Sequence, residues 1–540
     1  NAGAQYVSVE GAGLLILFLL SHRREVASKY QYVAQSKTNR LNCQCRYNVE
    51  CWTEKSSAFM LCAPTFFVTK GQHANEVEST QTPNRFCYCM NRNQSIALAL
   101  ILAIVALSFL IPLETPERVV VALALISAIC WTLEPIPIPL TALGLLLALP
   151  VSGVTTFEST FAAFGRPAVW LVFSGMVISQ LITETKLGDI LSSLIAGRLQ
   201  HSTAFILELS LFGVLLALLI PSGVVRVLIA LPVLTALIDA LKAERNSPLS
   251  AAIVLSVVCA TYYGGTGILT ASVPNLVIMG VLEGQGHSVF WAEWAGYVFP
   301  VIGLLRVLAG ALVIILLFRP KLPDHPNLPS SPFEFGRREA KALGLLLLGV
   351  AGWATDAIHH IHPVVIGLGL SILCMAPRIG PLNADHLRKV NYPIIIYIGS
   401  VFALGDAFVA SGASERLAEA FAAWLDLADR PVFMQLAAIS YVVTPFNFLV
   451  DTAVVGGVLT PPLLSLSAVS GLTPLQVGLS VAVGTGMVFM PYQGAPFMIA
   501  YAYGYATMRQ FVLTMMLICL VNLIVLVPLN LVYWKCVGLY

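Results

Sequence analysis

Long apolar runs dominate the chain from residue 96 to its end. A helix that crosses the hydrocarbon core of a bilayer needs about 20 mainly apolar residues, and many of these runs approach or reach that length. Examples are 96–113, 118–131, 139–151, 204–220 and 511–534. Their recurrence predicts an all-α polytopic membrane protein with about 11 transmembrane helices.

Two short stretches interrupt this apolar pattern. They cover 264–275 and 490–496, and both are rich in glycine, proline and small or polar residues that break a helix. Backbone without helical hydrogen bonds is tolerated at membrane depth only where it is buried in protein or lines a polar cavity. One broken helix in each half of a membrane chain is typical of transporter binding sites. We therefore predict two broken helices that form a transport site.

Composition agrees with the membrane class. The chain is 57% hydrophobic and 11% charged, with a mean hydropathy of +0.82. Soluble proteins average about half apolar and about a quarter charged residues. The formal net charge is only +2, and no basic stripe accompanies the aromatic residues. The sequence therefore predicts a lipid-embedded protein and no nucleic-acid partner.

The region 1–89 differs from the rest. It is mainly polar and contains six of the eleven cysteines. A disulfide or zinc module is one interpretation of such a region, but the cysteines lack paired two-residue spacing or histidine partners. Met90 and the polar residues after it look like an ordinary bacterial start before an apolar helix. We expect 1–89 to be an atypical extension outside the fold, and 90–117 to form the first transmembrane helix.

A polar segment divides the remaining chain near its middle. Residues 319–341 contain five prolines and five Lys or Arg residues. Cationic loops are retained on the cytoplasmic side of membranes, so this segment is predicted to be a cytoplasmic linker. It separates a first half, 118–318, from a second half, 342–540.

The two halves echo each other. Three pairs of residues are each separated by 224 positions, namely Pro139 and Pro363, Gly175 and Gly399, and Pro221 and Pro445. Pro274 and Pro496, in the two interrupted stretches, are separated by 222 positions. This spacing indicates two structural repeats that pair the broken helices. We expect inverted repeats, although the spacing alone leaves their orientation open.

Residues 264–275 resemble the signature Gly-Gly-x-x-Thr-Leu-Ile-Gly-Thr-Pro-Pro-Asn of the divalent anion sodium symporter family. Gly264, Gly265, Leu269, Pro274 and Asn275 match in place, and Ser272 stands for a threonine. The second copy, 494–498, is degenerate where the family has Gly-Thr-Pro-Pro-Asn. The resemblance extends over about 96–534.

The resemblance implies sodium-coupled symport of a small anion, a dicarboxylate, tricarboxylate or sulfate, across the cell membrane. It also implies re-entrant hairpins, an elevator-like movement and a homodimer. No cofactor is implied beyond sodium as the coupling ion, and no other metal.

The family carries a Ser-Asn-Thr triplet at the tip of a hairpin in each half, where it contacts substrate and sodium. Here only Ser222 of the first triplet survives, and the second falls on 451–453. The resemblance implies a substrate-binding set made of Ser222, Gly223, Val224, Arg226, Asp451, Thr452 and Ala453. It implies a cation-binding set made of Ser222, Gly223, Ala271, Ser272, Asn275, Asn447, Asp451, Thr452 and Gly494.

Arg226 and Asp451 are ionisable residues within apolar sequence, where a charge is costly and usually functional. The repeat spacing places Arg226 opposite Val450, so we expect the two charges to meet. One interpretation is a structural ion pair, since removal of either partner leaves the other charge buried. The other is that Arg226 binds the anionic substrate and Asp451 binds the coupling cation or a proton.

Two alternatives to sodium symport stay open at this point. Asp451 and the altered triplets favour proton-coupled transport or antiport of another ion. A membrane-embedded enzyme would need a nucleophile with its base, or paired metal ligands, and the apolar helices offer no such set. His359, His360 and His362 are interpreted as a turn at the membrane interface, because they lack carboxylate or cysteine partners at metal-ligand spacing.

Overall fold

The computed structural model describes residues 60–61, 88–89, 92–109, 113–187, 202–322, 335–425, 430–448 and 450–540. Most of the predicted extension, 1–89, and most of the central part of the linker, 319–341, lie outside the described residues. Two compact units divide the chain at residue 103. In the first unit, β1 (Met60–Leu61) pairs with β2 (Tyr88–Cys89) in antiparallel register. Helix α2 (Arg92–Ser108) begins in this unit.

The second unit is helical throughout its described residues. Its first stretch contains α3 (Thr115–Leu133), α4 (Ile138–Val151), α5 (Phe157–Ala162), η1 (Ala163–Gly165), α6 (Pro167–Thr183), α8 (Ser202–Leu219), α9 (Gly223–Ala240), α10 (Pro248–Thr266), η2 (Leu269–Ala271), α11 (Val273–Gly284), α12 (Trp291–Val298), η3 (Phe299–Leu305) and α13 (Arg306–Phe318).

Its second stretch contains α14 (Arg337–Ala354), α15 (Asp356–His359), α16 (Pro363–Met375), η4 (Ala384–Lys389), α17 (Tyr392–Ala410), α18 (Ala413–Leu425), α19 (Val432–Val443), η5 (Thr444–Phe448), α20 (Thr452–Ser465), α21 (Ser467–Ser470), α22 (Pro474–Thr485), η6 (Pro491–Gln493), α23 (Ala495–Ala502), α24 (Met508–Val521), η7 (Asn522–Leu526) and α25 (Val527–Cys536).

The closing elements of both stretches follow the same order. In the first, α10 ends, η2 forms a single 3-10 turn, α11 follows, and a π-helical turn joins α12 to α13. In the second, α22, η6 and α23 repeat this order, and a π-helical turn joins α24 to α25. Both predicted helix breaks are therefore confirmed. That the stretches are inverted repeats stays a prediction.

Six helices of the described chain are long and apolar enough to cross a membrane, and a seventh is gained if the bent pair α5–η1 and α6 is one span. The bend in that pair is 47°. Shorter apolar helices, such as α8, α11, α20 and α22, accompany them. Short apolar helices are expected where spans are broken. Length and composition alone do not count these short helices as crossings, so the number of about 11 stays a prediction.

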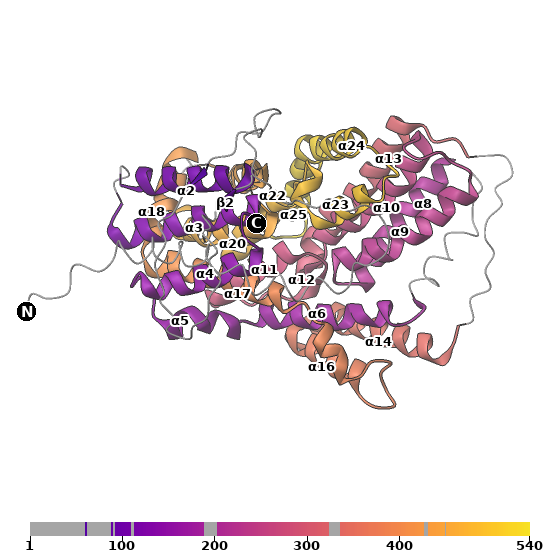
Figure 1. Cartoon of the computed structure of the whole chain (residues 1–540), viewed down its shortest axis with the longest axis horizontal. Coiled ribbons are helices and arrows are strands. Elements are labelled where there is room, and N and C mark those ends of the chain that lie inside the picture. Colours follow the sequence, from indigo (N-terminus) through magenta and orange to yellow (C-terminus); the bar gives the residue numbers. More distant parts are fainter. Residues whose placement is uncertain are drawn as a thin grey trace, which may run out of the picture. The chain divides into compact units, whose positions relative to one another are not determined.

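Helix α10 packs against α8, α9 and α13 (Figure 1). Nearly all of its side chains are buried. Gly213 permits the close approach of α8 to α10. A Cβ at this position would lie 2.8 Å from the Ala260 Cβ and 2.9 Å from the Val257 carbonyl oxygen. Small residues at such contacts let helix backbones approach closely, which favours helix packing in membranes.

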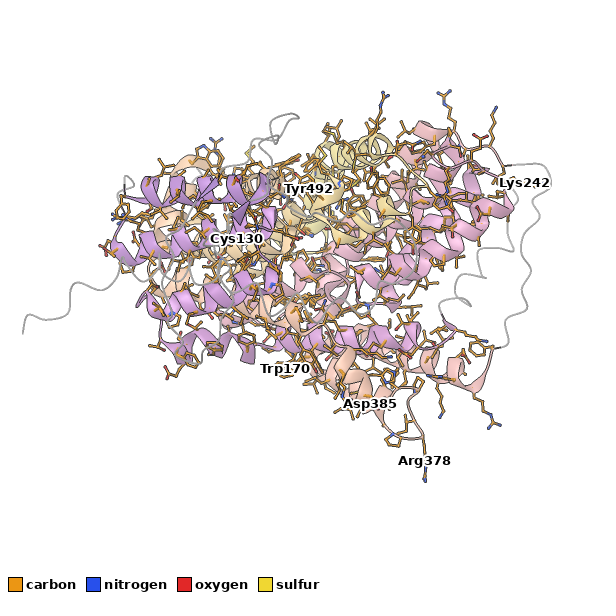
Figure 2. All side chains as sticks on the ribbon, in the orientation of Figure 1. Cys130, Trp170, Lys242, Arg378, Asp385 and Tyr492 are labelled. Carbon is orange, nitrogen blue, oxygen red and sulfur yellow. The ribbon has the colours of Figure 1, made fainter. Side chains whose placement is uncertain are left out.

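Charged side chains gather at helix ends and turns. Lys242, Arg378 and Asp385 are exposed, and Arg378 points away from the helices (Figure 2). At the end of α6, Glu184 pairs with Lys389 and lies 3.6 Å from His386 of η4. The hydrogen bond from Lys389 holds the pKa of the Glu184 carboxyl below its ordinary value. These contacts connect the first stretch to the second outside the apolar core.

The contact of α11 with α6 and α17 depends on Gly280. A Cβ at this position would lie 2.4 Å from the Phe402 ring and 2.8 Å from the Ala168 Cβ. The glycine therefore marks a point where three helices meet without space for a methyl group.

We expect Gly280→Ala to destabilise the protein by about 1–3 kcal/mol, the usual effect of overpacking a filled core. Thermal unfolding of purified protein in detergent measures this. Gly344→Ala is the matched control, because Gly344 lies within α14 and a Cβ there would meet nothing within 4 Å. A stability loss that is equal in both variants would contradict the packing argument.

Candidate functional site

The first helix break leaves backbone carbonyls beyond the end of α10, and Asn275 bonds two of them. Its amide nitrogen donates to the Thr266 carbonyl oxygen at 2.9 Å and to the Ile268 carbonyl oxygen at 3.1 Å. Asn275 is 1% exposed, so these two hydrogen bonds lie inside the protein. The predicted cation ligand Asn275 thus closes the break with its amide nitrogen.

Asn447 performs the same task at the second break. Its amide nitrogen donates to the carbonyl oxygens of Gly484 at 2.8 Å and Met487 at 2.9 Å. Gln493 completes the arrangement: its side-chain oxygen accepts from the Phe489 and Met490 amides at 2.7 and 2.6 Å. The Gln493 amide nitrogen donates to the Asn447 carbonyl oxygen. Side-chain amides therefore replace the missing helical donors at both breaks.

Arg226 of α9 reaches the first break and is 2% exposed. Its two terminal nitrogens donate to the carbonyl oxygens of Ile220 and Ala271, both at 2.9 Å. Two glycines make room for the guanidinium group. A Cβ would lie 2.9 Å from a guanidinium nitrogen at Gly265 and 3.2 Å at Gly223.

The expected meeting of Arg226 with Asp451 is wrong. Within the described residues, the ion pairs of the protein include neither side chain. Arg226 turns to carbonyls of its own half, whereas an oxygen of Asp451 accepts from the Ala453 amide at 2.9 Å and caps α20. Asp451 is exposed, and Tyr397 of α17 lies within reach of its carboxyl group. Both charged side chains thus form hydrogen bonds with backbone groups and not with each other.

Helix α9 begins next to the second break, and α20 packs against the start of α11 one turn after its own start. A Cβ on Gly223, the first residue of α9, would lie 3.3 Å from Pro496 at the start of α23. A Cβ on Gly456 of α20 would lie 3.6 Å from the carbonyl oxygen of Pro274 at the start of α11. The four helices therefore meet in crossed pairs, one member from each half.

The predicted site residues differ in their accessibility. Ser222, Gly223, Val224 and Ser272 are half-buried, and Asp451 is exposed. The buried members of the two predicted sets are Arg226, Ala271, Asn275, Asn447, Thr452, Ala453 and Gly494. Ser222 caps α9 by accepting from the Val225 amide at 3.4 Å. The start of α9 and Asp451 are therefore the more exposed parts of the two predicted sets.

Tyr262 is a central residue that the sequence interpretation missed. Its ring would lie 3.1 Å from a Cβ at Gly494, and its centroid is 4.7 Å from that of Phe497. Its hydroxyl lies within reach of the Thr452 side chain. Tyr262 thus connects α10 with both the second break and the start of α20. The available signal was a polar aromatic side chain two residues before Gly264 in an otherwise apolar helix.

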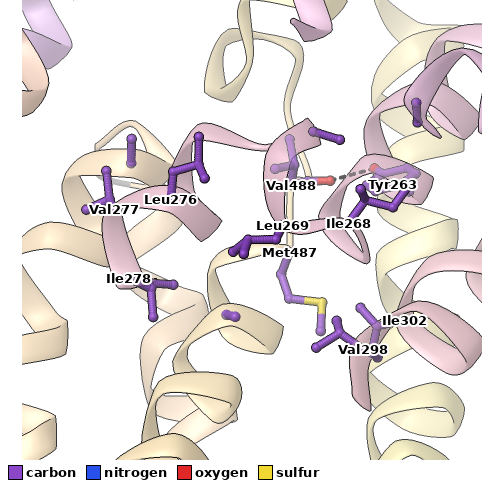
Figure 3. Close-up of a cluster of buried hydrophobic side chains, with 14 of the residues drawn as sticks. Tyr263, Ile268, Leu269, Leu276, Val277, Ile278, Val298, Ile302, Met487 and Val488 are labelled. Carbon is purple, nitrogen blue, oxygen red and sulfur yellow. Dashed lines mark hydrogen bonds between the residues drawn. The ribbon is translucent and has the colours of Figure 1, made fainter. Parts of the chain in front are cut away.

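Arg306 is a second missed residue, and it is completely buried. One terminal nitrogen donates to the Gly486 carbonyl oxygen at 2.8 Å, and the guanidinium carbon lies 4.1 Å from the centre of the Tyr263 ring. The Tyr263 hydroxyl donates to the Val488 carbonyl oxygen at 2.8 Å (Figure 3). Apolar side chains such as Ile302 and Met487 surround this region.

The described residues contain no group of three or more His, Cys, Asp or Glu side chains that could hold a metal ion. His359 ends α15, His360 follows in a left-handed conformation with φ 54°, and His362 caps α16. His362 also lies 2.7 Å from Glu283. These histidines form the turn that their sequence context predicts.

Residues 91–540 match the model of the family described as "Sodium:sulfate symporter transmembrane region". The chain belongs to this family. Its helix breaks, its apolar spans and the family match together identify a multi-pass membrane protein that is a transporter, not an enzyme. The resemblance recognised in the sequence is thereby confirmed.

Several relatives of this symporter-family chain are transporters. An uncharacterized transporter of Haemophilus influenzae is 23% identical over 81% of this chain and 96% of its own length. The chloroplastic dicarboxylate transporter 2.2 of Arabidopsis thaliana is 24% identical over 80% of this chain and 82% of its own. The L-tartrate/succinate antiporter of Escherichia coli strain K12 is 21% identical over 64% of this chain and 74% of its own.

A solved structure has a similar fold. The crystal structure of the Alcanivorax borkumensis YdaH transporter matches with a TM-score of 0.51, at 16% sequence identity. The match covers 79% of this chain and 99% of the other. At this identity the match supports the helical transporter architecture of this family member and says nothing about its substrate.

We expect Asn275→Ala to lower stability by about 1–3 kcal/mol, because two buried carbonyl oxygens lose their donor. Thermal unfolding in detergent measures the loss. Ser272→Ala is the control at the same break, because the Ser272 side chain does not cap α11. If the two variants unfold at the same temperature, the Asn275 amide does not hold the break together.

Proposed function

We propose that this protein is a secondary active transporter of a small anion, a dicarboxylate, tricarboxylate or sulfate, across the cell membrane. The observation that carries this proposal is the crossed meeting of helix starts, where the beginning of α9 lies against the beginning of α23. Each helix N-terminus carries about half a positive charge in its free N–H groups. Two such ends at one point repel each other unless an anion lies between them or nearby.

The accessible members of the substrate-binding set agree with an anion at the start of α9. Ser222, Gly223 and Val224 are half-buried, so their backbone amides and the Ser222 hydroxyl can face a solute. Arg226 lies one turn further along the same helix and adds positive charge behind these amides. A small carboxylate or sulfate oxygen is the ligand that such a group of donors favours.

We propose a coupling cation, sodium in the first instance, at the second break. The side-chain oxygen of Asn447 is buried and has no hydrogen-bond partner among the described residues. Because the amide nitrogen is used by two carbonyls, this oxygen is free to accept a cation. Sodium, like other hard cations, prefers amide, carbonyl and carboxylate oxygens. Asp451, four residues further along the chain, supplies a negative charge to the same region.

Proton coupling or anion exchange is the second candidate. Asp451 is exposed and forms no ion pair among the described residues, so its carboxyl group can bind and release a proton. An L-tartrate/succinate antiporter is also among the relatives, which supports exchange as a mode of this fold. In either mode we propose a homodimer with inverted repeats and an elevator-like movement of the broken helices.

Uptake of labelled succinate, citrate and sulfate into proteoliposomes tests the proposal. We expect saturable uptake of at least one of these anions, stimulated by an inward sodium gradient. Uptake driven by a proton gradient alone would support proton coupling, and uptake driven by internal anion alone would support anion exchange, in place of sodium coupling. If none of the three anions enters under any gradient, the proposed substrate class is wrong.

We expect Asp451→Asn to slow gradient-driven uptake by about tenfold or more, the factor that accompanies a loss of about 1.4 kcal/mol of binding free energy. The amide oxygen of asparagine can still accept from the Ala453 amide, so α20 keeps its cap. Initial uptake rates over a range of sodium concentrations and pH values measure the effect. Asp385→Asn, on exposed η4, is the matched control. Wild-type rate and wild-type ion dependence in Asp451→Asn would remove this residue from coupling.

A further inference from the structure

We infer that the guanidinium group of Arg226 is a built-in cation of the first break, in the position that a mobile coupling ion would otherwise take. The inference rests on the proposed function, because it concerns the number of cations that accompany the anion. Its consequence is that the transport cycle takes up one coupling cation, at the second break, instead of one at each break.

The partners of Arg226 are those of a bound metal cation. The Ile220 carbonyl follows the last residue of α8, and the Ala271 carbonyl ends η2. Carbonyls at the end of a helix carry the partial negative charge of the helix dipole. Carbonyl oxygens at an unwound helix are also the groups that coordinate sodium in membrane transporters. The guanidinium group occupies these oxygens with two hydrogen bonds of 2.9 Å.

The charge of Arg226 has no acidic partner within the described residues. A buried arginine without a carboxylate is costly, and such charges are normally paired when their role is structural. Here helix-end carbonyls alone balance it. A structural ion pair is thereby excluded for the conformation described, and the arrangement is that of an ion in a carbonyl site.

The guanidinium group packs closely against the glycine backbone beside these carbonyls. A Cβ on Gly265 would lie 2.9 Å from a guanidinium nitrogen and 3.4 Å from the Ala271 carbonyl oxygen. Gly223 and Val224 also lack the side-chain oxygens that could coordinate an ion at the start of α9. The first break thus has one cation, and it is covalently attached.

The second break differs, although it also has a buried arginine. Arg306 donates to the Gly486 carbonyl oxygen at 2.8 Å. It leaves the side-chain oxygen of Asn447 without a partner among the described residues. At the first break the arginine takes the Ile220 and Ala271 carbonyl oxygens, whereas the second break keeps the side-chain oxygen of Asn447 as an acceptor for a mobile ion. The two halves therefore share an architecture and differ in their demand for cations.

The test compares sodium responses of variants that free the first-break carbonyls. Arg226→Gln removes the positive charge, and Gly265→Ala displaces the guanidinium group while the arginine remains. Arg226→Lys keeps a positive charge. Gly264→Ala is the matched control, because a Cβ there would meet Val214 and Val307 at 3.3 and 3.4 Å instead of the arginine.

Two measurements are made on each protein. The first is the melting temperature in detergent, in sodium chloride against choline chloride, which requires no transported substrate. The second is the dependence of labelled succinate uptake into proteoliposomes on sodium concentration. A ligand that binds only the folded state raises the melting temperature, so an added sodium site is visible in the first measurement.

We expect Arg226→Gln and Gly265→Ala to gain a sodium-dependent rise in melting temperature of a few degrees beyond that of the wild type. Arg226→Lys and Gly264→Ala should respond as the wild type does. In uptake, the wild-type sodium curve should be hyperbolic, and the curve of Gly265→Ala should become sigmoidal because a second sodium ion is required. If one variant fails to fold, the other still decides the outcome.

The inference is overturned if neither Arg226→Gln nor Gly265→Ala gains a sodium response, or if the wild type already shows a sigmoidal sodium curve. Failure of the proposed function has a different signature. In that case the wild type transports none of the anions, while the melting temperatures still report whether sodium enters the first break when the arginine is removed or displaced.

Discussion

The architecture of this protein depends on how backbone carbonyls are satisfied where helices break inside an apolar environment. Lipid offers no hydrogen-bond donor, so each carbonyl beyond the end of α10 or α22 requires a donor from the protein itself. Asn275 and Asn447 each bond two such carbonyls, and Arg226 and Arg306 bond others. The polar residues of the site therefore support two irregular segments of backbone. Their further roles depend on the polar atoms that these hydrogen bonds leave without a partner.

Crossed packing of the halves gives the site its electrostatic character. The start of α9 lies against the start of α23, and α20 packs against the start of α11. The first of these contacts brings two positive helix ends together. Gly223 and Gly456 allow the approach because a larger side chain would meet Pro496 or the Pro274 carbonyl. Small residues thus permit the close packing of helices from the two halves.

The halves are similar in element order and unequal in chemistry. A serine caps α9 and an aspartate caps α20, so one helix start is neutral and the other carries its own negative charge. Arg226 adds a positive charge to the first half, and its nearest polar contacts are carbonyls. The two halves of this transporter therefore offer different charges at corresponding helix starts.

The sequence by itself determined the membrane class, the family, the two helix breaks and most residues that surround them. Apolar run length and the Gly-Gly to Pro-Asn signature are local properties, so they need no tertiary information. Only the tertiary structure decided the partners of those residues. Arg226 and Asp451 were expected to meet because repeat spacing aligned them, yet spacing does not say which way a long side chain turns. Tyr262 and Arg306 were missed for the same reason, because their partners Gly494 and Gly486 lie in the other half of the chain and are brought near only by the packing of the two halves.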